Sequence, residues 1–166
     1  MSPTKYRLQP VFDKKEKIKK DAEKALADTR AGLVKQQEIL QQKEEAVKQA
    51  IKKKDDYSAD LTAKMDKGME MSKITAAKAY LEVLKQNIET AKKKVEEQKA
   101  VVREWEKKVE VALQNVTEAT KELKVIEKHK ENWVAAVKKE EEEKEDKENE
   151  EVAQNLYEMN RRQRQS

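Results

Sequence analysis

The sequence predicts an all-α protein that folds as a long antiparallel two-helix coiled-coil hairpin. Three observations predict this fold class. More than half of the 166 residues are Ala, Glu, Lys, Arg or Leu, whereas only two are Gly and two are Pro, a composition typical of long helices. Apolar residues recur at the heptad spacing of a coiled coil. One short break near Gly68 separates the two periodic segments, and so the chain is expected to fold back on itself.

The first periodic segment predicts a cap segment over residues 1–10 and a helix over residues 11–66. Pro10 favours a helix start, because a proline in the first turn lacks only a donor that has no acceptor within the helix. Gly32 lies in the helix interior, where it costs about 1 kcal/mol relative to Ala. Seven-residue spacing identifies the core positions of this helix as Leu26, Leu33, Leu40, Val47 and Leu61.

Residues 67–72 predict the hairpin turn. Gly68 can end the first helix in a left-handed conformation, and Ser72 is expected to cap the second helix at its N-terminus. A connection this short predicts that the two helices pack antiparallel.

The position of the turn also predicts the register of the two helices. Folding about Gly68 pairs residues whose numbers sum to roughly 137. Trp105 then faces Gly32 and Leu33, and a glycine is expected there because a bulky indole needs a small residue opposite. The same register places Trp133 against residues 6–8.

The second helix is predicted over residues 73–151, and its core is the clearest pattern in the chain. Nineteen positions between residues 74 and 137, taken at alternating steps of three and four, are all apolar except Gln98 and Lys130. Apolar residues make up only 36% of the chain, and so this regularity indicates a coiled-coil core. Its larger members are Leu81, Leu84, Ile88, Val95, Val102, Trp105, Val109, Val116, Leu123, Ile126 and Trp133.

The core pattern stops after residue 137. Residues 138–151 form a charged extension with a net charge of −5, given by four Lys against nine Asp and Glu, and are expected to continue the helix in solvent. Residues 152–166 are expected to form a separate tail, either a frayed terminus or a docking segment. This tail carries a short apolar stripe followed by a basic group: Val152, Leu156, Tyr157 and Met159, then Arg161, Arg162 and Arg164.

The composition argues against an enzyme, a cofactor and a metal site. The chain has no cysteine and a single histidine, His129, which leaves no metal-ligand cluster of either residue. Two glycines cannot build a phosphate-binding loop, and a two-helix hairpin offers no deep pocket in which catalytic groups converge. No apolar run approaches the length of a membrane span, and the N-terminus lacks an apolar signal region. We therefore expect a cytoplasmic protein that is not inserted in a membrane.

The charges favour a protein partner and not nucleic acid. The 38 basic residues are nearly balanced by 34 acidic ones, whereas nucleic-acid binding needs a clustered basic face. Residues 1–30 carry nine positive and five negative side chains, a moderate basic patch without interleaved aromatic residues for base stacking. An acidic protein surface suits this patch better.

Three methionines gather at the predicted turn, Met65, Met69 and Met71. Methionine packs adaptably and is frequent at binding surfaces. These side chains either close the turn or contact a partner, and Tyr57 and Tyr80, which lie near the same end of the hairpin, are expected to contribute to one of these roles.

Both ends of the chain carry a motif that is not a by-product of heptads. The N-terminus reads Tyr6-Arg7-Leu8-Gln9-Pro10-Val11, followed by Lys14-Lys15-Glu16. The C-terminal part reads His129-Lys130-Glu131-Asn132-Trp133, then an acidic run and Leu156-Tyr157. Together with the length and the hairpin position, these motifs resemble the YscO-like proteins of bacterial type III secretion, most closely their chlamydial branch. FliJ of the flagellar export apparatus is a more distant relative. In one departure, Arg7 stands where the family pattern has Pro.

The resemblance implies a central stalk similar to the γ subunit of rotary ATP synthases. It implies that the end carrying the termini binds a hexameric type III secretion ATPase and promotes its assembly or activity, while the turn points to a membrane export-gate protein. Secretion chaperones are further implied partners, and the location implied is cytoplasmic, at the inner-membrane secretion apparatus. The isolated chain is expected to be a monomer. The alternative is a general coiled-coil adaptor, scaffold or chaperone-binding protein outside secretion.

The implied contacts are regional. The ATPase region comprises Tyr6, Arg7, Lys14, Lys15, Lys17, Lys20, Arg161, Arg162 and Arg164. The export-gate region comprises Tyr57, Met65, Met69, Met71 and Tyr80.

Overall fold

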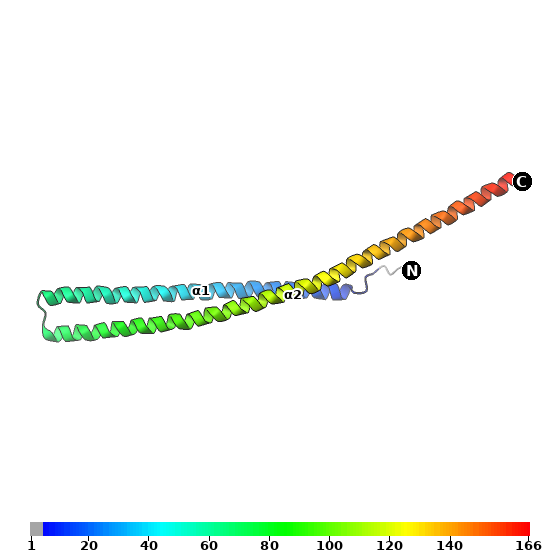
Figure 1. Cartoon of the computed structure of the whole chain (residues 1–166). Helices are drawn as coiled ribbons and strands as arrows, with labels where there is room; N and C mark the ends of the chain where they lie inside the picture. The colour runs from blue at the N-terminus through cyan, green and yellow to red at the C-terminus, as the bar shows by residue number, and fades with distance from the viewer. Residues whose placement is uncertain (1–4) are drawn as a thin grey trace. The chain divides into compact units, whose positions relative to one another are not determined.

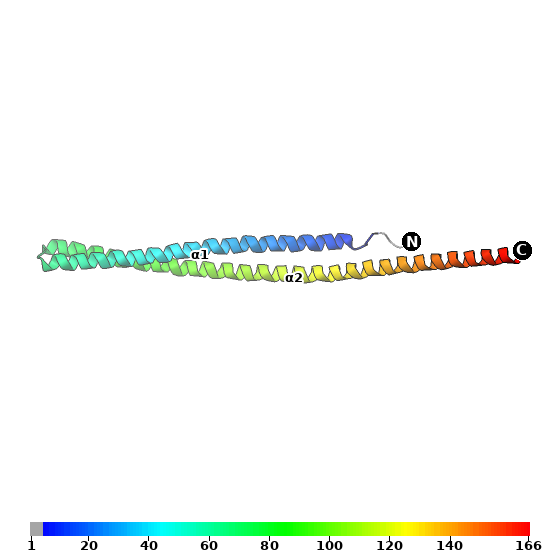
Figure 2. The same ribbon diagram turned by 90° about the horizontal axis from the view of Figure 1, so that it is seen from above.

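A computed structural model describes residues 5–166, and this part of the chain consists of two helices without a strand. Helix α1 spans Gln9–Asp66 and helix α2 spans Met71–Gln165. Figures 1 and 2 show the two helices joined by the turn at residues 67–70. The predicted all-α, two-helix hairpin is confirmed.

The contacts between the helices divide the chain into two units. Unit 2 is Glu23–Asn115, and unit 1 combines residues 5–22 with Val116–Ser166. In each unit a segment of α1 packs against a segment of α2, and the two units are described separately below.

The turn in unit 2 depends on a left-handed glycine. Gly68 has a φ of 89°, a conformation that only glycine adopts without strain, and its amide donates to the carbonyl of Met65 at 3.1 Å. This confirms the predicted left-handed end of the first helix. The carbonyl of Glu70 accepts from the amides of Lys73 and Ile74 at 3.1 and 3.0 Å, and so α2 begins at Met71.

The expected N-cap at Ser72 was therefore wrong, because Ser72 lies inside the first turn of α2 and Glu70 occupies the capping position. At the other end of α1, the carbonyl of Leu8 accepts from the amide of Phe12 at 2.9 Å. The helix consequently starts at Gln9, two residues before the expected start, and Pro10 still lies in its first turn.

The register within unit 2 is the predicted one. A Cβ built on Gly32 would meet Cη2 of Trp105 at 2.6 Å and Cε3 at 2.9 Å, and so the indole lies directly against the glycine backbone. Nearer the turn, the rings of Tyr57 and Tyr80 meet at 4.9 Å. Both pairs have the sum of residue numbers expected from a fold about Gly68.

The core of unit 2 is apolar with one polar interruption. The buried apolar side chains are Leu26, Leu61, Ala77, Leu84, Ile88, Val95, Val102 and Ala112. Gln98 is also buried, with 5% of its surface exposed. Its amide nitrogen donates to the backbone carbonyl of Gln36 at 3.1 Å and to the side-chain oxygen of Gln36 at 2.8 Å. Lys43 donates to its oxygen at 3.4 Å, and so the polar core position is fully hydrogen-bonded, as burial requires.

Unit 1 has a smaller core. Tyr6, Ala119 and Leu123 are its buried side chains, and the remaining core positions from Val116 to residue 137 are half-buried. An ion pair joins the two helices, between Lys15 Nζ and a carboxylate oxygen of Glu122 at 2.8 Å.

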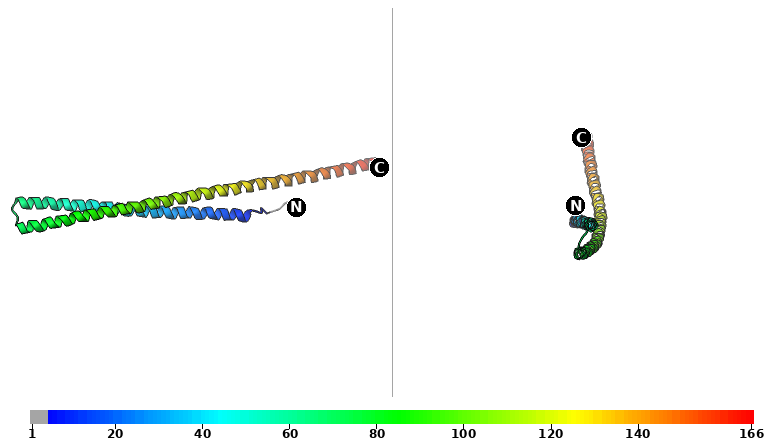
Figure 3. Two further views of the ribbon diagram at one scale, coloured as in Figure 1. Left: turned by 60° about the horizontal axis from the view of Figure 1, so that its bottom comes forward. Right: turned by 90° about the vertical axis from the view of Figure 1, so that its left-hand side faces the viewer.

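Beyond residue 137, α2 continues to Gln165 as one helix (Figure 3). Every side chain of residues 138–166 is exposed. No Gly or Pro interrupts this stretch, and Lys138 and Lys139 each approach the glutamate four residues on at 3.9 Å, an arrangement that supports exposed helices. The residues expected to form a separate tail, 152–166, are thus part of α2 as far as Gln165.

Candidate functional site

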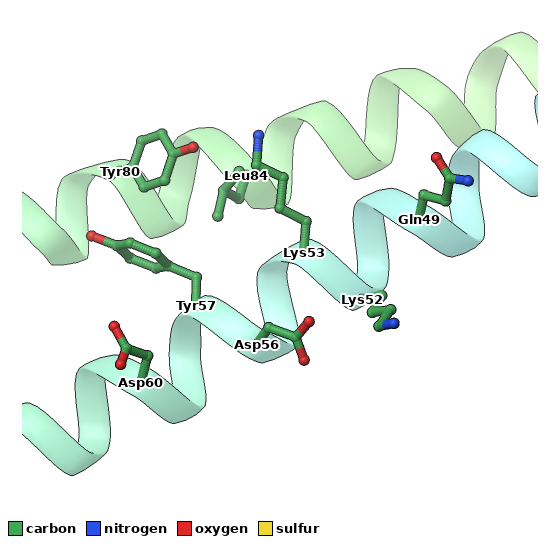
Figure 4. Close-up of a pocket in the computed structure, with 8 residues that line it drawn as sticks. All are labelled: Gln49, Lys52, Lys53, Asp56, Tyr57, Asp60, Tyr80 and Leu84. Carbon is green, nitrogen blue, oxygen red and sulfur yellow. The ribbon is translucent and has the colours of Figure 1, made fainter.

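A groove between the helices of unit 2 is the first candidate surface. Tyr57 of α1 and Tyr80 of α2 meet edge to face, with an angle of 72° between their rings. Leu84, which lines the same groove, is buried, while 40% of Tyr80 is exposed. Figure 4 shows Tyr57 between the two ribbons, Tyr80 and Leu84 along α2, and Lys53 reaching across from α1. We call this surface the tyrosine groove.

The tyrosine groove is open and has charged walls. Its volume is about 480 Å³, and its remaining lining residues are Gln49, Lys52, Lys53, Asp56 and Asp60. Aromatic floors with charged rims are frequent in protein interfaces, because the rings exclude water while the charges select the partner. The groove thus suits an apolar side chain from a partner that carries charges of both signs.

The methionines beside the turn extend this surface. Met71 is 74% exposed and Met65 38%, whereas Met69 is half-buried. Nothing lies within 4 Å of a Cβ built on Gly68. The turn is therefore open on that side, and Met65 and Met71 present apolar surface beyond what the turn needs for closure.

The second candidate surface is in unit 1, where the N-terminal segment is held by aromatic side chains. Tyr6 is 7% exposed, its hydroxyl is 2.6 Å from Nδ1 of His129, and its ring is 5.2 Å from that of Trp133. The predicted contact between Trp133 and residues 6–8 is confirmed. Because the ring of Tyr6 is buried, it holds the segment in place and leaves the exposed Arg7 available to a partner.

The predicted basic residues of α1 lie on the exposed side of unit 1. Lys14, Lys17 and Lys20 are exposed, and Lys20 approaches Glu16 at 3.8 Å. Lys15 is half-buried and already paired with Glu122. Arg7, Lys14 and Lys17 are thus the accessible cations of this surface, which we call the basic surface.

An apolar groove in unit 1 was not predicted from the sequence. Phe12, Val134 and Ala135 line it together with Glu127, Lys130 and Glu131, and its volume is about 440 Å³. The ammonium group of Lys130 lies 4.8 Å from the centre of the Phe12 ring, a cation–π contact. The lysine that interrupts the heptad pattern therefore covers an aromatic ring, which the heptad pattern does not reveal.

The three terminal arginines do not join the basic surface. Lys15 is level with Glu122, and Arg162 lies forty residues further along a continuous helix, a separation of about 60 Å at 1.5 Å per residue. Arg161, Arg162 and Arg164 instead form a second basic group at the end of α2. The two halves of the predicted ATPase region are therefore separate surfaces.

Comparisons with known proteins agree with this geometry. The profile of the YscO-like protein family matches residues 3–163. The chain belongs to the YscO-like family. A solved structure of a YscO homologue from Chlamydia trachomatis superimposes with a TM-score of 0.80 at 29% sequence identity, covering 96% of this chain and 99% of that one. No curated protein sequence matches the chain significantly.

Membership of the YscO-like family makes this a type III secretion-associated coiled-coil protein. The resemblance inferred from the two end motifs is thus confirmed. Within residues 5–166, neither helix contains a stretch that is long and apolar enough to cross a membrane.

Proposed function

We propose that this YscO-like chain is a non-enzymatic central stalk of a type III secretion apparatus. In this role the chain binds the hexameric secretion ATPase, promotes its assembly or activity, and links it to the membrane export gate. The observation that carries the proposal is the family match over residues 3–163. The stalk acts in the cytoplasm, peripherally at the inner-membrane apparatus, and takes secretion chaperones as further partners.

The basic surface supports the ATPase contact. Arg7, Lys14 and Lys17 are exposed, and the segment before α1 is held by the contacts of Tyr6 with His129 and Trp133. Cations on a preorganised surface bind an acidic partner at a lower entropic cost than cations on a flexible arm. Unit 1 is therefore the part that we assign to the ATPase.

The tyrosine groove and the methionine turn support the export-gate contact. Tyr57 and Tyr80 form an aromatic floor, and Met65 and Met71 add exposed apolar surface. Aromatic side chains in water-excluding grooves frequently dominate the binding energy of protein interfaces. Unit 2 is therefore the part that we assign to the gate.

The ATPase contact is tested by measuring ATP hydrolysis by the cognate secretion ATPase with and without the full chain. The variant Arg7→Glu/Lys14→Glu/Lys17→Glu is expected to bind about tenfold more weakly, because it reverses the charges of the basic surface that steer association. The matched control reverses three exposed lysines of unit 2, Lys35, Lys93 and Lys107, and is expected to stimulate hydrolysis normally. Equal loss in both variants, or stimulation that survives in the first, contradicts the assignment to unit 1.

The gate contact is tested by pull-down of the cytoplasmic domain of the export-gate protein. Tyr57→Ala/Tyr80→Ala should abolish capture, whereas Tyr157→Ala, which removes a 71% exposed tyrosine of unit 1, should not. Circular dichroism checks that both variants keep their helices. Capture by the groove variant at the level of the unmodified chain contradicts the assignment to unit 2.

A further inference from the structure

The end of α2 has no partner within the described part of unit 1. We call residues 138–165 the overhang. All of its side chains are exposed, although the segment is helical throughout. A long polar helix that stays helical in solvent is a preformed surface for another helix, because most of the ordering cost has already been met within the chain.

The overhang carries a narrow apolar stripe. Val152, Leu156 and Met159 are 56%, 55% and 58% exposed, and their spacing places them on one face of the helix. Asn149 and Gln163 continue the same face on either side. The stripe therefore has the a and d spacing of a short coiled-coil seam with polar ends.

The charges on either side of the stripe have opposite signs. Residues 138–151 carry a net charge of −5, from four Lys and nine Asp and Glu, whereas Arg161, Arg162 and Arg164 follow the stripe. A second copy in antiparallel orientation brings the acidic part of each overhang against the basic part of the other. A parallel copy brings like charges together, which is unfavourable. The overhang is therefore complementary to itself in one orientation only.

We propose that the overhang pairs antiparallel with the overhang of a second copy of this chain. In an antiparallel coiled coil each core layer pairs an a residue of one helix with a d residue of the other. The stripe supplies four such layers when Val152 packs against Leu156 of the second copy and Asn149 packs against Met159 of the second copy, each contact occurring twice by two-fold symmetry.

This register also pairs opposite charges beside the seam. Glu148 and Arg162 occupy the flanking position next to the stripe, and each faces the other residue on the second copy. Within residues 5–166 neither side chain takes part in an ion pair. Sliding the copies by one heptad places Glu148 opposite Asn155 in one direction and beyond the end of the partner helix in the other. The charges therefore select a single register.

The pair is expected to be weak. Three apolar residues from each copy give an interface at the low end of known sizes, below about 1,200 Å². The chain is therefore monomeric when dilute, as expected from its sequence, and the pair forms at high-micromolar concentration. The proposal does not rest on the proposed function, since it concerns the chain alone.

Sedimentation of the full chain over a wide concentration range tests the pairing. Arg162→Glu brings two glutamates opposite each other at both flanking contacts, and Glu148→Arg brings two arginines opposite each other at both. Each variant alone is expected to associate at least about tenfold more weakly. An equimolar mixture of the two single variants should associate, because a mixed pair brings opposite charges together. The doubly substituted chain Glu148→Arg/Arg162→Glu should also associate, because a pair of two such chains restores both ion pairs.

Arg161→Glu is the matched control, because it makes the same charge change on the face of the helix opposite the stripe. It should leave the association almost unchanged. The proposal is overturned if the unmodified chain stays monomeric at high concentration, if Arg161→Glu weakens association as much as Arg162→Glu, or if the mixture of single variants does not associate. An overhang that binds only the ATPase and never a second copy also overturns it, while leaving the proposed stalk function intact.

Discussion

Replacing Gly32 with Ala is expected to destabilise the protein, against the usual preference of helices for Ala. On intrinsic propensity alone, alanine in a helix interior stabilises by about 0.5–1 kcal/mol relative to glycine. At this position the added Cβ would meet Cη2 and Cε3 of Trp105 at 2.6 and 2.9 Å. Overpacking of this kind costs about 1–3 kcal/mol, and so the mid-range net change is a loss of about 1 kcal/mol.

Movement of the indole away from Gly32 would disturb its other contacts. The ammonium group of Lys108 lies 4.4 Å from the centre of the Trp105 ring, and the ring is half-buried between the helices. In the background of Trp105→Leu the space opposite Gly32 opens, and the same Gly32→Ala change is expected to stabilise by about 0.5–1 kcal/mol. The double-mutant cycle should give a coupling energy of about 2 kcal/mol.

Urea and thermal unfolding, followed by circular dichroism at 222 nm, measure all four members of the cycle. Gly32→Ala should lower the melting temperature by about 2–4 °C per kcal/mol lost, and the sign should reverse with Trp105→Leu. A stabilising Gly32→Ala in the unmodified background would refute the argument that the indole requires this glycine. An equal effect in both backgrounds would show that the two residues are not coupled.

Three further predictions concern stability and order. Gln98→Leu should be neutral or stabilising by about 1 kcal/mol in urea unfolding, because a hydrogen-bonded polar core residue specifies register more than it stabilises; a clear loss of stability contradicts this. Tyr6→Ala should reduce the hydrogen-exchange protection of backbone amides in unit 1 but not in unit 2, because it deletes the contact with His129. Tyr6→Phe keeps the ring and should lose less of this protection. Gly68→Ala should lower the stability of the fold by about 1–2 kcal/mol, because residue 68 has a positive φ of 89°. Gly68→Asn should lower it less, and equal melting temperatures for the two variants would exclude the backbone conformation as the cause.

The hairpin was predictable because the heptad spacing of apolar residues fits few folds other than a coiled coil. Its register was predictable because few positions offer a small residue opposite a tryptophan. Heptad spacing defines which face of each helix is buried, and a tryptophan opposite a glycine is a steric match that survives small errors in the turn. The cap at Ser72 was not predictable in the same way. Serine has a high intrinsic preference for the N-cap position. The left-handed Gly68 is followed by only two connecting residues, Met69 and Glu70, and so α2 begins at Met71, before Ser72.

The candidate surfaces were predicted in part. The meeting of Tyr57 and Tyr80 follows from the register, as does that of Tyr6 and Trp133. The groove beside Phe12 did not, because Val134 lies beside the heptad seam and Lys130 looked like an interruption of it. Periodicity identifies what the two helices bury against each other, and it carries no signal for the apolar residues that remain at the edge of that seam.

The overhang shows why a change in apolar pattern does not end a helix. Nucleation is the costly step of helix formation, and each residue added to an existing helix costs little when side chains at i and i+4 attract one another. Residues 138–165 extend a helix already held by the packing of unit 1, and ion pairs such as Lys138–Glu142 support it.

The proposed self-pairing through Arg162 should compete with binding of the ATPase to the end of α2. One guanidinium group cannot face Glu148 of a second copy and an acidic surface of the ATPase at the same time, and so the two assemblies compete for the end of α2. Because the self-pair buries only a short stripe, the ATPase needs only modest affinity to displace it. Adding the ATPase to concentrated chain should therefore convert the pair to ATPase-bound monomers, and a second copy that remains on the ATPase-bound chain would mean that the arginines do not contact the ATPase.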